Sequence, residues 1–239
     1  MRPSTASLAV ATAGLILTTA CASVQAQERA SYTFYRNGAA VGRHVVQSSA
    51  PGPRHTVDVS THVAVQIANR ITLFRYSHQS HETWEGERLV ALDSRTDDDG
   101  RQHRVLASSG AAGLVVRATI PEVENASTSD RMMSFSAMTT ERLVEQVVPG
   151  NVLPSSWSHF KIVQQTRLLN SQTGNVMPIS VQQLGTDVVQ TGIGQIPATR
   201  YRLSGMVAPL DIWYDNRGRW LKSAFKGRDG STIEMILDR

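Results

Sequence analysis

The sequence contains a single cysteine, Cys21, among its 239 residues. One cysteine excludes an internal disulfide framework and a thiolate zinc cage. Charged residues make up 18% of the chain and hydrophobic residues 41%, values that exclude an intrinsically disordered protein. The sequence also lacks a helical repeat and an apolar run long enough to span a membrane as a helix. These absences leave a globular protein of one or two domains.

The chain is basic, but its basic residues are not clustered. Arginine outnumbers lysine by 21 to 3, and the formal net charge is +4. Nucleic-acid-binding proteins gather such residues on one face and add aromatic platforms, so the scattered arginines argue against nucleic acid as a partner. Association with an anionic membrane surface or polysaccharide is compatible with this charge.

Residues 1–26 have the pattern of a secretory signal peptide. One arginine precedes the apolar run Leu8–Leu17, and Val24-Gln25-Ala26 offers small residues where the signal peptidase reads them. The run would rise about 15 Å as a helix, half of a bilayer core of about 30 Å, so we expect no transmembrane span. We predict Sec-type cleavage near Ala26 and a periplasmic or secreted mature protein. The alternative is a lipoprotein anchored through Cys21, which follows a degenerate lipobox.

Alternation of apolar and polar residues dominates the mature chain and predicts strands. In Val57–Ile67 the odd positions carry Val, Thr and Ile, and the even positions carry Asp, Ser, His, Ala and Gln. A strand with one buried face and one solvent-exposed face indicates an antiparallel sheet. Asn37-Gly38 and Asp97–Gly100 mark turns between strands. We therefore predict one mainly β domain over residues 27–239, a strongly curved antiparallel sheet (half-barrel or open barrel) of about ten strands.

Two segments interrupt the alternation and predict helices. Thr139–Val148 precedes a Pro-Gly pair, and Trp157–Leu169 has an apolar face at helical spacing. We expect one or two helices to lie across the concave side of the sheet. Because a long sheet has to curl or close to remove its edges, this arrangement would enclose a cavity.

The string from His78 to Glu82 offers the best candidates for catalysis. In a strand, His78 and His81 point to opposite faces, which makes a shared metal ion geometrically difficult. His78 and Glu82 share a face and, with Arg95 as a neighbour, could transfer a proton. The alternative is a structural polar ladder on a sheet.

No other catalytic signature is present in the sequence. It has no G-x-S-x-G, no Walker A loop and no G-x-G-x-x-G after a strand. Asp97–Gly100 lacks the spacing of a calcium loop and predicts a solvated turn. Asp211 and Asp215 share a face and would form an acid–base pair only in a cleft. We therefore predict neither a metal nor a cofactor.

Aromatic residues are few, at 6% of the chain, and fill either a core or an apolar ligand pocket. The candidates for lining such a pocket are Trp84, Trp157, Phe160, Trp213 and Trp220.

Four segments resemble a family of exported bacterial proteins of unknown function: Tyr32–Gly38 with Val41-Gly42, Tyr76–Trp84, Arg88–Gly100, and Leu210–Asp215 with its continuation to Glu234. The resemblance covers most of the mature chain except about residues 118–150, and it implies no activity. More distantly, the order of elements is similar to periplasmic half-barrel proteins of the lipoprotein-carrier type. Some of those carriers hold acyl chains on their concave face, which implies a lipid-binding cavity by fold analogy.

Three functions follow from these observations. The first is non-enzymatic carriage of a hydrophobic ligand, a lipid or an acyl chain, between the sheet and the helix expected at Trp157–Leu169. The second is an envelope hydrolase that uses His78, Glu82 and Arg95. The third is an envelope scaffold that pairs with partners through a sheet edge.

Overall fold

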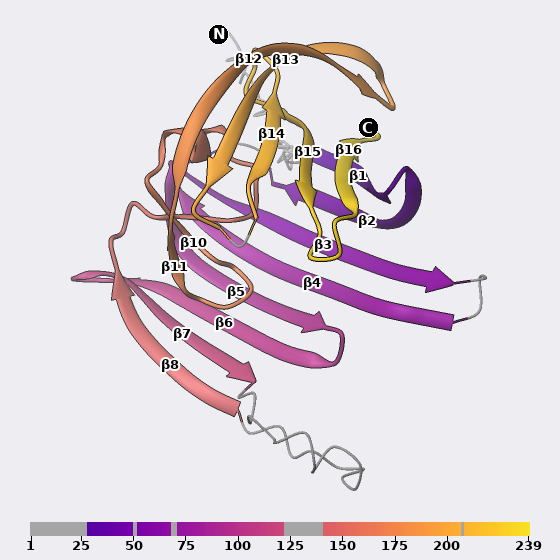
Figure 1. Cartoon of the computed structure of the whole chain (residues 1–239). Coiled ribbons are helices and arrows are strands. Elements are labelled where there is room, and N and C mark those ends of the chain that lie inside the picture. Colours follow the sequence, from indigo (N-terminus) through magenta and orange to yellow (C-terminus); the bar gives the residue numbers. More distant parts are fainter. Residues whose placement is uncertain (1–27, 50–51, 68–70, 122–140, 207) are drawn as a thin grey trace, which may run out of the picture.

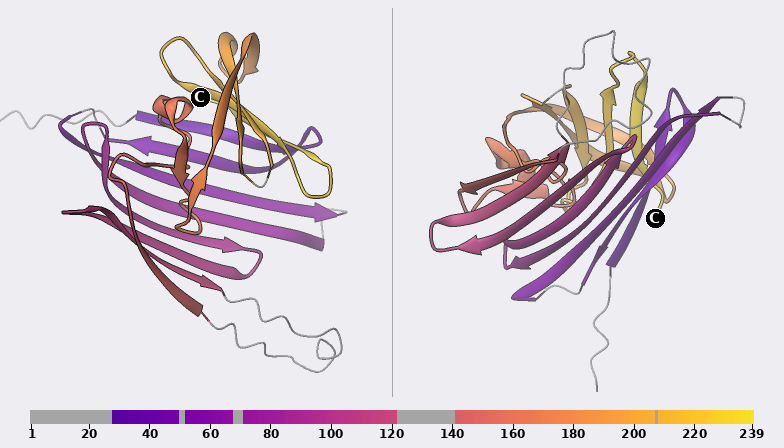
Figure 2. Two further views of the ribbon diagram at one scale, coloured as in Figure 1. Left: turned by 60° about the vertical axis from the view of Figure 1, so that its left-hand side comes forward. Right: turned by 90° about the horizontal axis from the view of Figure 1, so that it is seen from below.

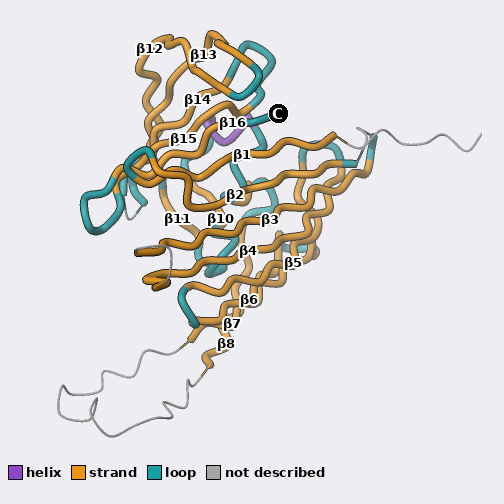
Figure 3. Tube along the Cα trace, turned by 90° about the vertical axis from the view of Figure 1, so that its right-hand side faces the viewer, coloured by secondary structure: helices purple, strands orange, loops and turns teal. Residues whose placement is uncertain are grey.

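The computed structural model describes residues 28–49, 52–67, 71–121, 141–206 and 208–239 (Figure 1). The expected export signal and Cys21 lie outside these residues, as do residues 122–140. Strands make up most of the described chain (Figure 3). The sequence prediction of a mainly β protein with an antiparallel sheet is therefore confirmed.

Thirteen strands form the main sheet, in the spatial order β12-β13-β14-β15-β16-β1-β2-β3-β4-β5-β6-β7-β8. All neighbouring pairs are antiparallel, and the C-terminal strand β16 pairs with the first strand β1. The strands are β1 (Glu28–Arg36), β2 (Ala39–Ser48), β3 (Arg54–Ile67), β4 (Ile71–Glu85), β5 (Arg88–Asp98), β6 (Arg101–Gly110), β7 (Gly113–Pro121), β8 (Glu141–Val148), β12 (Ser180–Thr191), β13 (Gly194–Ser204), β14 (Leu210–Tyr214), β15 (Trp220–Lys226) and β16 (Thr232–Leu237).

Local sequence explains where these strands lie and turn. In β3 the side chains of Val57, Val59 and Thr61 are buried, whereas the side chains between them are more exposed to solvent, as the alternation predicts. Asn37 and Gly38 have φ angles of 50° and 82°, which a tight hairpin of this kind requires. The expected strand and hairpin are therefore both confirmed.

A separate segment, residues 149–179, crosses one face of the main sheet, and we call it the strap (Figures 1 and 2). It contains a small sheet of β9 (Leu153–Pro154), β10 (Arg167–Leu169) and β11 (Val176–Pro178), and the 3-10 helix η2 (Phe160–Gln164). We call the face that the strap covers the inner face and the opposite one the outer face. The strap helps to close the core because Ile162, Leu168 and Leu169 are fully buried.

The main sheet bends toward its inner side near β1. Trp220 of β15 and His44 of β2 are separated by two strands, which is about 14 Å on a flat sheet. Their ring centroids are nevertheless 5.3 Å apart, and both rings meet Tyr32 of β1, which stacks on Trp220 at 4.1 Å. The Tyr32 hydroxyl also donates to the Trp220 carbonyl at 3.0 Å. This aromatic cluster fixes the bend.

Both helix predictions are wrong. Thr139–Val148 was expected to be helical, but Glu141–Val148 is the edge strand β8 and pairs with β7. In Trp157–Leu169 only Phe160–Gln164 forms a short 3-10 helix, which ends because Gln165 is extended. The residues that follow pair in β10, so their apolar side chains are buried by sheet pairing instead of by a helix face.

The expected half-barrel of about ten strands is also wrong. The main sheet has thirteen strands and is open, with β12 and β8 as its edges. The inner face is covered by the strap, so neither closure nor a strong curl is needed to bury it.

Shortening a strap residue should destabilise the protein. Leu169→Ala removes a fully buried side chain and is expected to lower the free energy of unfolding by about 2–5 kcal/mol, measured by urea denaturation. Leu143→Ala is the matched control, because Leu143 is 68% exposed on β8 and its loss should change stability by less than about 0.5 kcal/mol. Equal effects of the two substitutions would contradict a core that is sealed by the strap.

Candidate functional site

The inner face of β4 carries polar side chains in the middle of the core. His78, Ser80 and Glu82 occupy successive inward positions, and each is less than 8% exposed. Polar groups of this kind are seldom fully buried without partners, so this stripe is the most unusual feature of the core.

A row of histidines and threonines crosses the stripe from strand to strand. The register places His44, Thr61, His78, Thr96 and His103 opposite one another on β2 to β6. His44 Nδ1 lies 2.8 Å from Thr61 Oγ1, and His78 Nδ1 lies 2.7 Å from Thr96 Oγ1. Each imidazole of these two pairs is therefore held by the hydroxyl of the next strand.

Burial keeps these histidines neutral. It lowers the pKa of His44 to about 3 and that of His78 to about 4, and it also lowers the pKa of His103. His44 Nε2 and His103 Nδ1 are buried and have no hydrogen-bond partner within the protein. Two ring nitrogens of the row are thus free to donate to or accept from another molecule.

Glu82 forms a second polar centre, where the stripe meets the strap. Its Oε2 accepts a hydrogen bond from Trp84 Nε1 at 3.0 Å, while its Oε1 has no partner. Burial raises the pKa of Glu82 to about 7, although the nearby Ser156 hydroxyl and the Trp84 indole oppose the rise. Ser156 belongs to the strap, its Oγ makes no well-aligned hydrogen bond, and its neighbour His159 stacks on Trp84 at 5.3 Å. A carboxyl in this state can donate or accept a proton near neutral pH.

The three residues suggested for catalysis do not come together. His78 and Glu82 share the inner face but lie four residues apart along β4, about 13 Å, and each bonds to a different partner. Arg95 points to the outer face and is exposed. His81 also faces outward, so the expectation that His78 and His81 point to opposite faces is confirmed.

The five aromatic residues suggested for a ligand pocket lie at separate places. Trp84 and Trp220 are 1% exposed within the core. Trp157 and Phe160 belong to the strap, where the Trp157 carbonyl accepts from Tyr214 and the Phe160 ring contacts Tyr214 at 5.2 Å. Trp213 lies on the outer face beneath Arg200 and Lys222 and donates to Asp187 at 2.7 Å. The contacts of these rings are with protein groups and do not define one pocket.

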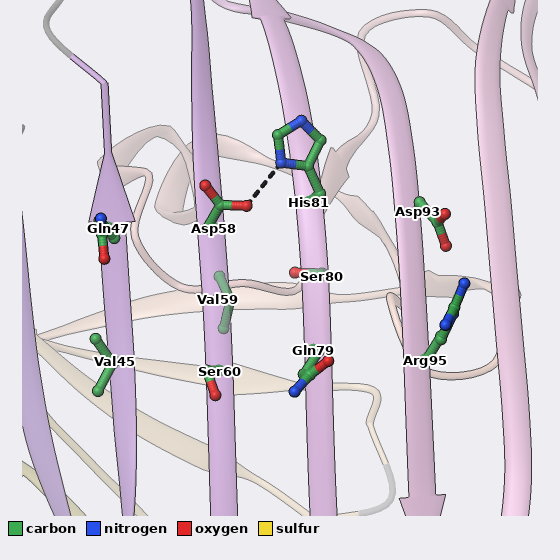
Figure 4. Close-up of a pocket in the computed structure, with 10 residues that line it drawn as sticks. All are labelled: Val45, Gln47, Asp58, Val59, Ser60, Gln79, Ser80, His81, Asp93 and Arg95. Atoms are coloured by element: carbon green, nitrogen blue, oxygen red, sulfur yellow. Dashed lines mark hydrogen bonds and ion pairs between the residues drawn. The ribbon is translucent and has the colours of Figure 1, made fainter.

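An open hollow of about 350 Å³ lies on the outer face of β2 to β5 (Figure 4). His81 Nδ1 is 2.6 Å from Asp58 Oδ1 there, and both side chains are about half exposed. Ser60 pairs with His62 instead, at 3.3 Å, so no serine–histidine–aspartate series is assembled. The hollow is lined by Val45, Gln47, Asp58, Val59, Ser60, Gln79, Ser80, His81, Asp93 and Arg95.

The remaining acidic candidates serve local structure. Asp211 binds Arg202 and Arg200, and the hydrogen bond from Arg202 is the main cause of its lowered pKa. Asp215 accepts from the backbone of the turn that follows it, and Asp97 accepts from Gly100 N–H at 2.7 Å. Among the described residues, no three His, Cys, Asp or Glu side chains are placed to hold a metal ion. No helix in the described ranges is long and apolar enough to cross a membrane.

Sequence reasoning missed most partners in the polar stripe. His44, Thr96, His103 and Ser156 were not singled out, because register and strap placement depend on distant residues. One signal was available: Thr61 occupies the apolar phase of an alternating strand. A polar residue in the buried phase indicates a partner across the sheet.

The raised pKa of Glu82 gives a stability prediction. Its folded pKa lies above the unfolded value of 4.5, so the folded state binds this proton more tightly and loses that advantage as the pH rises through about 7. Glu82→Gln should match the parent at pH 4 and be more stable by about 3 kcal/mol at pH 8. Urea denaturation across this range measures the difference, and a difference that does not vary with pH would contradict the raised pKa.

The lowered pKa of His78 gives the opposite prediction. The folded state favours the neutral ring, so this contribution is present above pH 6.5 and is lost as the pH falls toward 4. His78→Gln should lose about 3 kcal/mol less stability than the parent over this interval. His62→Gln, at an exposed position, is the control and should follow the parent. Identical acid denaturation of the parent and His78→Gln would disprove this assignment.

The chain matches one protein family over residues 32–238, from β1 to the end of β16. That family is described as a domain of unknown function, DUF6134. No curated protein matches the sequence. Since the match spans the main sheet and the strap together, the chain belongs to the DUF6134 family.

Proposed function

We propose that the protein is an exported, non-enzymatic binding protein that holds an amphiphilic ligand between the inner face and the strap. The ligand class is a lipid or acyl chain with a polar head. Export rests on the signal pattern of residues 1–26, with cleavage near Ala26 and a periplasmic location. The observation that carries the proposal is the set of buried polar atoms without partners on the inner face and on the strap.

Five such atoms lie on the inner side of β2, β4 and β6 or on the strap. Each buried polar group without a hydrogen bond destabilises the folded state by about 1–3 kcal/mol, so a purely structural core is not expected to contain a cluster of them. A polar head with donors and acceptors would satisfy neutral imidazoles and a carboxyl that is protonated near pH 7. The atoms are His44 Nε2, Ser80 Oγ, Glu82 Oε1, His103 Nδ1 and Ser156 Oγ.

The strap itself indicates that the ligand also has an apolar part. Entry beneath the strap would expose Ile162, Leu168 and Leu169, each fully buried, at about 1.5–3 kcal/mol per side chain. A purely polar ligand does not offset this loss, whereas an acyl chain packed on the same apolar surface does. Polar and apolar requirements together favour an amphiphile.

The strap is built as a unit that can move without breaking the main sheet. Its strands pair with each other, and its backbone hydrogen bonds, such as Ser155 N–H to the Leu169 carbonyl at 2.9 Å, are internal. Side chains attach it to the sheet: Ser94 Oγ donates to the Ser171 carbonyl at 2.5 Å, and Gln146 Nε2 donates to the Gly174 carbonyl at 2.7 Å.

Trp157 in the strap has a φ of 64°, a strained value for a bulky residue. Opening would relieve strain of about 1–3 kcal/mol there.

A reversible clamp tests the proposal. Ser94→Cys with Ser171→Cys places one thiol on β5 and one on the strap residue whose backbone carbonyl accepts from Ser94, and the sequence offers only Cys21 as a competitor. The oxidised variant should lose binding of a dansyl-labelled undecanoic acid, measured by fluorescence, and reduction should restore it. The parent under the same oxidant and each single-cysteine variant are the controls. Equal binding by the oxidised and reduced clamp, or none by the parent, refutes ligand entry beneath the strap.

Native mass spectrometry of protein isolated from the cell envelope provides an independent test. A co-purifying amphiphile that disappears in the oxidised clamp supports the proposal. A native mass equal to that of the protein alone, together with no change in the fluorescence of the dansyl-labelled acid, contradicts it.

A further inference from the structure

Glu82 differs from the other buried acids because no basic side chain pairs with it. Three acids are buried in the part of the chain that the structure describes, namely Glu82, Asp211 and Asp215. Asp211 binds Arg202 at 2.7 Å, and Asp215 binds Arg219 at 3.1 Å. No lysine or arginine of the described ranges is itself buried. An ionised Glu82 would therefore lie in the core without a counter-charge.

The two carboxyl oxygens of Glu82 have different surroundings. Oε2 accepts a hydrogen bond from Trp84 Nε1 at 3.0 Å, whereas Oε1 has no partner among the described residues. Because Oε2 already accepts an N–H, the proton of the neutral carboxyl belongs on Oε1. Oε1 is then a buried O–H donor, and it indicates an acceptor that a ligand supplies.

Two serine hydroxyls lie near this donor. The Ser156 hydroxyl, on the strap, is close enough to Glu82 to lower the pKa of its carboxyl. Ser80 occupies the preceding inward position of β4, about 7 Å along the strand. Both Oγ atoms are buried and have no partner within the described structure. The sheet and the strap together therefore offer a ligand up to three O–H donors.

These donors favour a head group with two acceptor oxygens and no fixed charge. A phosphate keeps its negative charge at neutral pH and would meet no cation here. An ammonium would require Glu82 to ionise inside the core, where burial favours its neutral form. An alcohol accepts through one oxygen only. A carboxyl group has two acceptor oxygens and can share a proton with a second carboxyl.

We infer that the ligand is a fatty acid whose carboxylate accepts a hydrogen bond from the neutral Glu82 carboxyl, an inference that rests on the proposed binding function. No covalent bond forms or breaks, and the pair of carboxyl groups shares one proton and one negative charge. That is the charge which an ionised Glu82 would carry alone, now spread over two groups. Ser156 then donates to the second carboxylate oxygen, which links the ligand to the strap.

The shared proton makes binding depend on pH. Burial raises the pKa of Glu82 to about 7, whereas an alkyl carboxylic acid in water is already ionised well below this pH. As the pH rises through 7, the free protein loses the Glu82 proton and two carboxylates would face each other. The affinity for a fatty acid therefore falls as the pH rises.

Other titratable groups lie around Glu82, and their contribution has to be separated from its own. They remain unchanged in a variant that replaces Glu82 alone, so such a variant makes the distinction. The groups are Asp58 and His81 on the outer face (Figure 4), His55 and His159 beside the Trp84 ring, and the surface pair of Glu87 and Lys161.

Calorimetric titration of the full chain with three amphiphiles of equal chain length tests the inference: decanoic acid, decanol and decylamine. Between pH 6.5 and pH 8.5 the affinity for decanoic acid should fall about 20-fold, because the protonated fraction of Glu82 falls by that factor. The affinity for decanol should change by less than about twofold, since decanol carries no charge.

Glu82→Gln should bind decanoic acid equally well at both pH values. The glutamine amide donates as the neutral carboxyl does, and it does not ionise. Glu145→Gln is the matched control, because it makes the same change at an exposed position on β8 and should keep the pH dependence of the parent. Circular dichroism of each variant confirms folding.

Several outcomes would overturn the inference. An affinity of the parent for decanoic acid that does not vary with pH is one, and an unchanged pH dependence in Glu82→Gln is another. If decanol binds more tightly than decanoic acid at pH 6.5, or decylamine binds more tightly as the pH rises, the binding function stands and the head group is wrong. Absence of binding by all three amphiphiles overturns the proposed binding function as well.

Discussion

The topology forces one segment to cross the whole sheet. β8 and β12 are opposite edges of thirteen strands, yet they follow each other among the strands of the main sheet. The chain between them therefore has to pass over a face, and the apolar side of the sheet is the one that gains from being covered. The strap follows from this constraint. Its small sheet and η2 are the local structure of a crossing segment, and its leucines and isoleucine provide the second layer of the core.

The polar stripe is compatible with this core because burial removes charge from it. The same desolvation that lowers the pKa of His78 raises the pKa of Glu82, so near neutral pH the histidine is uncharged and the carboxyl is substantially protonated. Hydrogen bonding is then the main remaining requirement. Thr61 and Thr96 provide hydrogen bonds to His44 and His78. His44 Nε2, His103 Nδ1 and Glu82 Oε1 have no partner within the protein. A structural ladder would be expected to satisfy both nitrogens of each ring, which is why a binding role fits better than a purely structural one.

Local signals predicted most strands and turns but little of their assembly. The alternation in β3 and the Asn37-Gly38 turn depend on neighbouring residues, and both were read correctly. A glycine alone does not distinguish a turn from a bulge, and Gly185 lies at a bulge inside the continuous strand β12. The helix expected at Trp157–Leu169 failed because pairing with β9 and β11 overrides an apolar period of 3.6. Cross-strand partners of His78 depend on register, which a single sequence does not contain.

The inner side of β4 leads from an apolar end of the strand to the polar groups near the strap. Phe74, Tyr76, His78 and Glu82 lie on the same face of one strand, since side chains alternate with a period of two. Phe74 lies where β4 extends past its last pairing with β5, Tyr76 reaches the strap residue Gln172 at 3.5 Å, and Glu82 lies near Ser156 of the strap. The distance from Phe74 to Glu82 along the strand is about 26 Å. The proposed amphiphile would therefore meet apolar contacts at one end of this strand and hydrogen-bonding groups further in.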